Sequence, residues 1–146
     1  ELVANYARWY ELPYAIAYFY NVYGPRELSG RYGTVIQIFH DCLTSTGVCK
    51  VNGPGTQTRN YTHVSDTVDA LLLIGETGEG DGFGIAASEA YSPLDLAELY
   101  GLEVDLQPQR KTSRPYANLD IDKTVDLGWQ PKMSLEQYIK DKKNQT

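Results

Sequence analysis

Hydrophobic positions follow two different periods along this chain. Residues 14–20 are almost all apolar or aromatic. This run is too short for a globular helix and is typical of a strand buried on both faces of a parallel sheet. Residues 2–11 carry apolar side chains at helical spacing, and the Pro13 that follows ends that pattern. The chain is therefore predicted to open with a helix and a buried strand.

The two periods continue to alternate, which indicates an α/β protein. Ser65 or Asp66 can cap a helix, and residues 92–95 and 134–137 carry the serine and acidic or amide residues of capping boxes. Residues 78–84 are a glycine-rich loop by composition. The further predicted helices cover 32–46, 66–74, 92–100, 122–127 and the segment from 134 onward, and the further predicted strands cover 48–52, 58–64, 83–87 and 102–106.

Length and charge exclude several classes of protein. The 146 residues fit one domain, and the net charge of −6 without a basic stripe argues against a nucleic-acid partner. No apolar run approaches the ~20 residues that a membrane span needs, and no secretory signal is recognisable. The two cysteines do not make a disulfide framework, so we expect a cytoplasmic protein. The two histidines and two cysteines lack the spacing of metal ligands, and we expect no metal.

Two polar residues are candidates for ligand binding. Asn21 follows the buried strand, and ligands of open α/β sheets bind outside the carboxyl ends of strands. The alternative is that Asn21 only caps the turn at Gly24 and Pro25. Arg59 lies in an extended, otherwise uncharged segment, and its guanidinium suits a phosphate. Arg110 and Arg114 could close on the same anion; the alternative is that each arginine pairs with a carboxylate.

Other motifs in the sequence are weaker evidence for a functional site. Residues 82–87 formally match a dinucleotide-binding fingerprint, but a predicted helix precedes them and a predicted strand overlaps them. We therefore expect a loop and a strand there. No nucleophile and base stand out as a pair, and His63 is expected to pack or to form a local hydrogen bond.

Four segments together resemble the extended short-chain dehydrogenase/reductases that act on nucleotide sugars. These are the NAD-dependent epimerases and dehydratases, of the UDP-glucose 4-epimerase type. The segments follow the family's order and cover essentially the whole chain: YFYNVYGPR (18–26), NGPGTQTRNYTHVSD (52–66), YSPLDLAEL (91–99) and LGWQPK (127–132).

The resemblance implies the C-terminal portion of a Rossmann-type enzyme with its small substrate-binding α/β domain. Residues 1–26 would be the last part of the Rossmann-type domain. Residues 27–146 would mainly form the nucleotide-sugar-binding domain, with a further sheet segment near 58–87. The N-terminal NAD-binding half, with its glycine-rich fingerprint and catalytic Tyr-x-x-x-Lys, is expected to precede Glu1.

The same resemblance implies site residues, none of them catalytic. Residues Thr34, Val35, Val51 and Asn52 would lie beside the nucleotide, Asn21 would contact the sugar-phosphate, Arg59 and Arg114 would bind the diphosphate, and Phe19 and Tyr20 would face the nicotinamide. The family usually has arginine at position 18, an aromatic residue at 52 and aspartate at 60, and its Arg-Pro-Gly-Asp loop is replaced here by residues 108–114. These departures leave the base and the sugar open.

The resulting hypothesis is that this chain is the substrate-binding half of an NAD-dependent nucleotide-sugar epimerase or dehydratase and that it is inactive alone. NAD is the cofactor of the parent family, and this chain alone is not expected to hold it tightly. The expected ligand is a UDP- or dTDP-sugar, and the expected protein partner is a second copy or the missing half. Two alternatives are a free-standing nucleotide-sugar-binding module and a structural protein whose apolar strand pairs with another chain.

Overall fold

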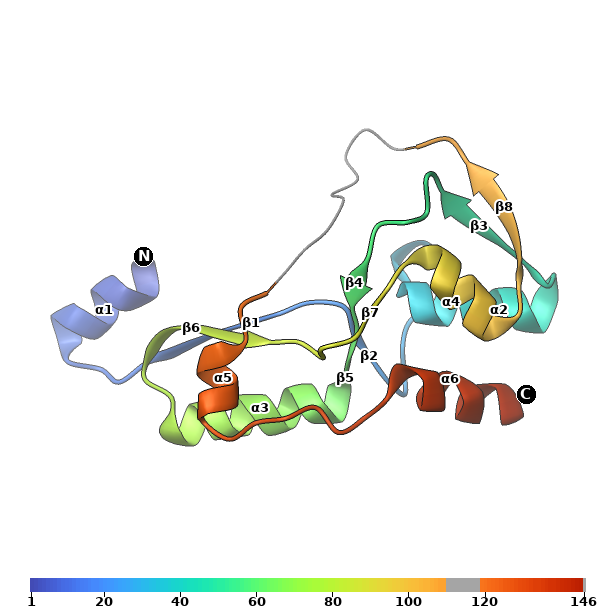
Figure 1. Ribbon diagram of the computed structural model, residues 1–146. Coiled ribbons are helices and arrows are strands. Elements are labelled where there is room, and N and C mark those ends of the chain that lie inside the picture. The colour runs from blue at the N-terminus through green and yellow to red at the C-terminus, as the bar shows by residue number, and fades with distance from the viewer. Residues whose placement is uncertain (110–118, 146) are drawn as a thin grey trace.

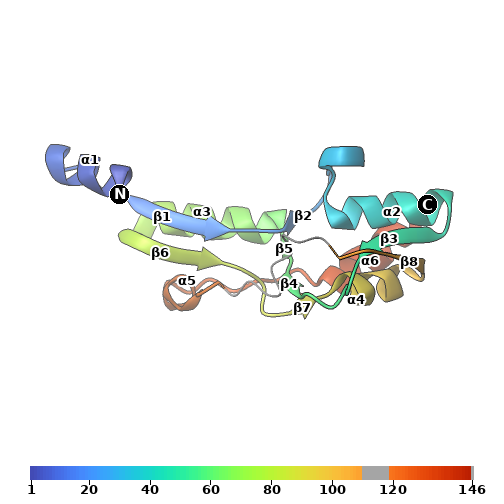
Figure 2. The same ribbon diagram turned by 90° about the horizontal axis from the view of Figure 1, so that it is seen from above.

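The computed structural model describes residues 1–109 and 119–145 as an elongated α/β chain with two lobes (Figures 1 and 2). The helices are α1 (Leu2–Tyr10), α2 (Val35–Ser45), α3 (Val64–Thr77), α4 (Pro93–Tyr100), α5 (Asp122–Asp126) and α6 (Leu135–Asn144), with a 3-10 turn at Gly30–Tyr32. The strands are β1 (Ala15–Phe19), β2 (Val22–Tyr23), β3 (Val48–Asn52), β4 (Arg59–Asn60), β5 (Thr62–His63), β6 (Gly80–Ile85), β7 (Ala90–Tyr91) and β8 (Glu103–Gln107).

The first lobe consists of α1, β1, α3, β6 and α5. Strands β1 and β6 are parallel, and α3 packs against them (Figure 1). Buried side chains of α3 and β6 meet a tryptophan that follows α5. The core of this lobe is Ala70, Ile74, Phe83, Ile85 and Trp129.

The prediction that residues 14–20 are buried on both faces is wrong for this chain. The first three residues of β1 are half-buried, and Tyr18, Phe19 and Tyr20 are exposed. In the described residues, β1 forms a ladder only with β6. The apolar strand therefore lacks the second cover that its composition predicts.

The second lobe consists of α2, β3, α4, β8 and α6. Strands β3 and β8 are parallel and in register from Val48 with Glu103 to Asn52 with Gln107. Helices α2, α4 and α6 contribute most of its core. The fully buried members include Tyr23, Ile36, Leu96, Tyr100 and Ile139. Short pairs, β2 with β5 and β4 with β7, connect this lobe to the first.

Local start signals predict α4 correctly, α6 in part and α3 incorrectly. At α6, Ser134 Oγ accepts from the Gln137 amide at 3.5 Å, but the Gln137 side chain donates to Asp141, so only half of the predicted capping box is confirmed. The capping box of α4 is confirmed: Ser92 Oγ accepts from the Asp95 amide at 3.1 Å, and an Asp95 carboxylate oxygen accepts from the Ser92 amide at 2.8 Å. The predicted cap of α3 at Ser65 or Asp66 is wrong. His63 caps it, because its Nδ1 accepts from the Ser65 amide at 3.2 Å. The local hydrogen bond expected of His63 is thereby confirmed.

Asp66 is instead buried, with 2% of its surface exposed. One oxygen of its carboxylate accepts from the backbone amides of Lys132 (3.0 Å) and Met133 (2.9 Å). The backbone carbonyl of Asp66 accepts from the Trp129 indole at 2.9 Å. One residue of α3 thus holds the segment that leads from α5 to α6.

None of the helices in 1–109 and 119–145 is both long enough and apolar enough to traverse a bilayer.

We expect Asp66→Ala to lower the free energy of unfolding by about 2–4 kcal/mol, because a buried carboxylate is removed and two partly buried amides lose their acceptor. Urea unfolding at neutral pH measures this. The matched control is Asp69→Ala on the same helix, whose carboxylate makes a solvent-exposed ion pair with Lys132 at 2.8 Å. That change should stay within about 0.5 kcal/mol of the wild type. Equal losses in the two variants would contradict the role given to Asp66.

Candidate functional site

The carboxyl ends of β1 and β6 lie side by side because the strands are parallel, with Phe19 opposite Ile85. Asn21 follows β1 and has a positive φ of 49°, a conformation that asparagine tolerates better than most residues. Its side-chain amide donates to the Asn60 carbonyl at 3.1 Å, and its own carbonyl accepts from the Thr62 amide at 3.3 Å. Asn21 is thus bound to the β4–β5 segment as well as ending a strand.

Asn60 extends this network to a third segment. Its side-chain amide donates to the Ala87 carbonyl at 2.8 Å, just beyond β6. A carboxylate could not donate this bond, so asparagine rather than aspartate suits the geometry here. A small cavity of about 10 Å³ lies beside the network and is lined by Tyr20, Asn21, Asn60, Ala86 and Leu119. A space of that size accommodates about one water molecule.

Arg59 directly precedes Asn60 and lies opposite Tyr91 in the β4–β7 pair. Its side chain is half-buried, and its Nη1 donates to the Thr58 carbonyl at 2.6 Å. Because Asn21 bonds to the neighbouring Asn60, the structure brings Asn21 to the short strand that carries Arg59, although the two residues are far apart in sequence.

The candidates for nucleotide contact lie in the second lobe. Thr34 is the N-cap of α2: its hydroxyl accepts from the Gln37 amide at 3.1 Å and donates to the Glu27 carboxylate. Val35 is the first residue of that helix. Val51 is 2% exposed, so its side chain belongs to the core, and Asn52 ends β3 half-buried.

The structure therefore shows two groups of candidate residues. Phe19, Tyr20 and Asn21 lie at the carboxyl end of β1, where both aromatic rings are exposed, and Asn21 bonds to the Asn60 that follows Arg59. The other group flanks the amino end of α2 and the carboxyl end of β3, on the far side of β4 (Figure 1). Arg110 and Arg114 lie outside the described residues.

One Tyr-x-x-x-Lys spacing was missed from the sequence: Tyr138 and Lys142 in α6. Burial, and then the nearby Glu27 carboxylate, raise the pKa of Tyr138 to about 12. The Lys142 ammonium lies 5.5 Å from the centre of the tyrosine ring, over its face. Tyr138 packs against the core of the second lobe, and the Lys142 ammonium binds Glu27 and Gln37, so the contacts of this pair are structural.

The fingerprint-like residues 82–87 lie mostly within a strand. Strand β6 covers residues 80–85, so the strand expected at 83–87 is confirmed for 83–85, and the loop expected at 78–84 is wrong from residue 80 onward. A Cβ at Gly84 would lie 1.9 Å from the Asp120 carbonyl oxygen, so this glycine permits close packing before α5. Across 1–109 and 119–145, no three histidine, cysteine or acidic side chains gather as a metal site.

Tyr61 lies between Asn60 and Thr62, and its side chain is buried in the second lobe's core. Burial raises the pKa of Tyr61 to about 12, against an ordinary value near 10. The folded state therefore keeps this proton at a pH where the unfolded state has released it. Its contribution to stability is fully present below about pH 10 and is lost as the pH rises toward 12.

We expect Tyr61→Phe to reduce the loss of stability between pH 9.5 and 11.5 by about 1–2 kcal/mol. Urea unfolding of both proteins across this range measures the difference. The control is the same pair at pH 7–9, where the two stabilities should run parallel. An unchanged alkaline decline would show that Tyr61 titrates alike in both states.

Comparison with known proteins gives consistent results. A sequence model of the NAD dependent epimerase/dehydratase family matches residues 1–86. A putative UDP-glucose 4-epimerase of Methanocaldococcus jannaschii is 29% identical over 96% of this chain and 48% of its own length. A dTDP-D-glucose 4,6-dehydratase of Bos taurus is 31% identical over 94% of this chain and 42% of its own length. The chain thus spans less than half the length of these curated relatives.

A solved structure shows the same fold. The UDP-glucose 4-epimerase of Thermotoga maritima, determined with UDP-glucose, superposes with a TM-score of 0.84 and 34% identity. The match covers 95% of this chain and 47% of that enzyme. The two lobes described above therefore correspond to part of an extended epimerase fold.

Proposed function

Because this chain belongs to the NAD-dependent epimerase/dehydratase family, we propose that it is the nucleotide-sugar-binding part of such an enzyme. The observation that carries the proposal is the hydrogen bond from Asn21 to the Asn60 carbonyl, which ties the carboxyl end of β1 to the short strand that carries Arg59. Relatives named for UDP- and dTDP-sugars support that ligand class.

In this proposal Arg59 binds the diphosphate. Its planar fork of donors matches phosphate oxygens, and half-burial strengthens the interaction relative to a fully solvated site. Asn21 contacts the sugar-phosphate. Thr34, Val35, Val51 and Asn52 flank the nucleoside, with Val51 contributing through its backbone because its side chain is in the core. Arg114 is proposed to close over the diphosphate.

NAD would contact this chain only at one end. The exposed rings of Phe19 and Tyr20 follow β1 and fit the nicotinamide side of a site. A pyrophosphate cradle needs a helix that opens from a glycine turn, and in the described residues the fingerprint-like glycines lie within β6 instead. In this family NAD accepts a hydride from the sugar and later returns it. We propose that this chain does not hold it tightly and does not turn over nucleotide sugars alone.

We expect the chain to bind a UDP- or dTDP-sugar, and Arg59→Ala to weaken that binding at least about tenfold, the loss typical of a charge-assisted phosphate contact. Calorimetric titration with UDP-, dTDP- and GDP-sugars measures this. Arg8→Ala, on exposed α1, is the matched control and should bind like the wild type.

The outcomes separate the alternatives. Binding that depends on Arg59, without turnover, supports the proposed substrate-binding part. The sugar nucleotide that binds then identifies the nucleotide base. Turnover by this chain alone would overturn the inactivity. No binding of any of the three sugars would overturn the function and favour a structural role.

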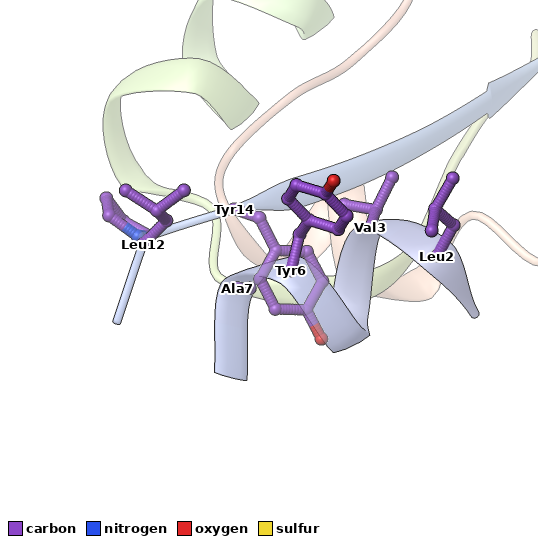
Figure 3. A pocket seen from close by; sticks show the side chains of 7 residues that line it. Leu2, Val3, Tyr6, Ala7, Leu12 and Tyr14 are labelled. Atoms are coloured by element: carbon purple, nitrogen blue, oxygen red, sulfur yellow. The ribbon is translucent and has the colours of Figure 1, made fainter. Parts of the chain in front are cut away.

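An apolar pocket beside α1 suggests where a protein partner would bind. Apolar side chains of α1 and of the residues that follow it, most of them exposed, line this pocket of about 460 Å³: Leu2, Val3, Tyr6, Ala7, Leu12, Pro13 and Tyr14 (Figure 3). Leu2 is 70% exposed and Trp9, on the same helix, 63%. Apolar groups gathered on one surface mark a protein contact. We propose that a second copy, or the remaining half of the family's fold, covers this face.

We expect the chain to self-associate at micromolar concentration, and Val3→Glu to shift it toward monomer because a charge would enter the apolar contact. Light scattering after size exclusion measures the mass. Leu28→Glu, at an exposed leucine in the loop before α2, should leave the mass unchanged. A wild-type chain that is monomeric throughout would contradict self-association and leave the other half as the proposed partner.

A further inference from the structure

A buried ion pair connects the last helix to the amino end of α2. The Lys142 ammonium lies 3.5 Å from one oxygen of the Glu27 carboxylate. The two side chains are only 17% and 6% exposed, whereas those of the Lys132–Asp69 pair are 72% and 48% exposed. A buried ion pair costs much desolvation, so its geometry and its other partners decide what it does.

Both members of the pair also bind the first turn of α2. The other Glu27 oxygen accepts from the hydroxyl of Thr34, the N-cap. Lys142 donates to the side-chain oxygen of Gln37 at 2.7 Å, and the Gln37 backbone amide donates back to Thr34 at 3.1 Å. The side-chain amide of Gln37 donates onward to Asp41 at 2.6 Å. The first turn is therefore held by charged groups from two other segments.

An aromatic ring of α6 lies against the same pair. The Lys142 ammonium is over the Tyr138 ring, 5.5 Å from its centre. If either charged partner is removed, the other loses this ion pair while its side chain remains largely buried. Such a charge draws in water or moves, and the hydroxyl and amide that it held move with it.

We propose that Glu27 is a positioning residue for nucleotide binding, acting with Lys142 to fix Thr34 and Val35 at the start of α2. The inference rests on the proposed function, because it assumes that the nucleoside lies against these two residues. It adds that α6 controls the affinity of a site that it does not line. Glu27 itself need not touch the ligand, since its carboxylate oxygens are directed to Thr34 and Lys142.

The test is calorimetric binding of a UDP-sugar and a dTDP-sugar to Glu27→Ala, Lys142→Met and the double variant. We expect each single change to weaken binding about tenfold, the loss typical when a group that orients a contacting residue is removed. The double variant should lose little more than either single one, because both changes break the same unit. Glu27→Gln keeps an acceptor for Thr34 and should recover part of the affinity.

Lys132→Met is the matched control, because it breaks the exposed ion pair and should leave affinity unchanged. Hydrogen exchange of the Gln37 and Ile38 amides gives a readout without ligand: protection should fall in Glu27→Ala and stay unchanged in Lys132→Met. Thermal unfolding confirms that each variant is folded at the titration temperature.

Lower stability with unchanged affinity would overturn the positioning role and leave a structural ion pair. Binding by the wild type that depends on Arg59 but not on Glu27 would overturn this inference alone. Absence of binding by the wild type would overturn the proposed function, and this inference with it.

Discussion

The parallel pairing of β1 with β6 is the constraint on which the rest of the structure depends. Two parallel strands cannot be joined by a tight turn, so residues 20–79 form one long crossover. The helix that completes it, α3, packs on the two strands as a crossover helix should. Two elements of the second lobe, α2 and β3, are built within this connection. The same pairing places the two strand ends side by side, next to the place where Asn21 bonds to Asn60, the neighbour of Arg59.

Most elements could be predicted from the sequence because they have local causes. The apolar period gave α2, β3 and β8 within a few residues, and Ser92 and Asp95 marked the start of α4. The family was recognisable because four motifs keep their order, and the sequence and structure comparisons agree with it. Asn21 and Arg59 were predicted from the same local reasoning: one ends a strand and the other is a lone charge in an extended segment.

The remaining features depend on contacts between distant residues, which no local pattern reveals. Asp66 could have capped α3, but amides from residues 132 and 133 reach it, and His63 takes the cap. The Glu27–Lys142 pair likewise joins opposite parts of the chain. The burial of β1 was overestimated. The apolar composition of a strand shows that it is suited to a buried position, but whether its two faces are buried depends on which other segments pack against them. Two of these features had a signal in the sequence. Asp66 is an acidic residue within the apolar pattern of a helix, and Tyr138 and Lys142 have the Tyr-x-x-x-Lys spacing.

The pairing of β1 with β6 also affects the order of events on the ribosome. At ~5–20 residues per second, β1 leaves the ribosome several seconds before its partner strand has been made. During that interval Tyr18 and Phe19 of β1, and the Tyr20 that follows it, belong to an unpaired apolar segment. The second lobe, whose β3 and α2 adjoin in sequence, can begin to form first. Pairing with β6 then satisfies the backbone of β1, whereas its aromatic rings stay exposed, so chaperone binding to the nascent chain is expected to centre on this segment.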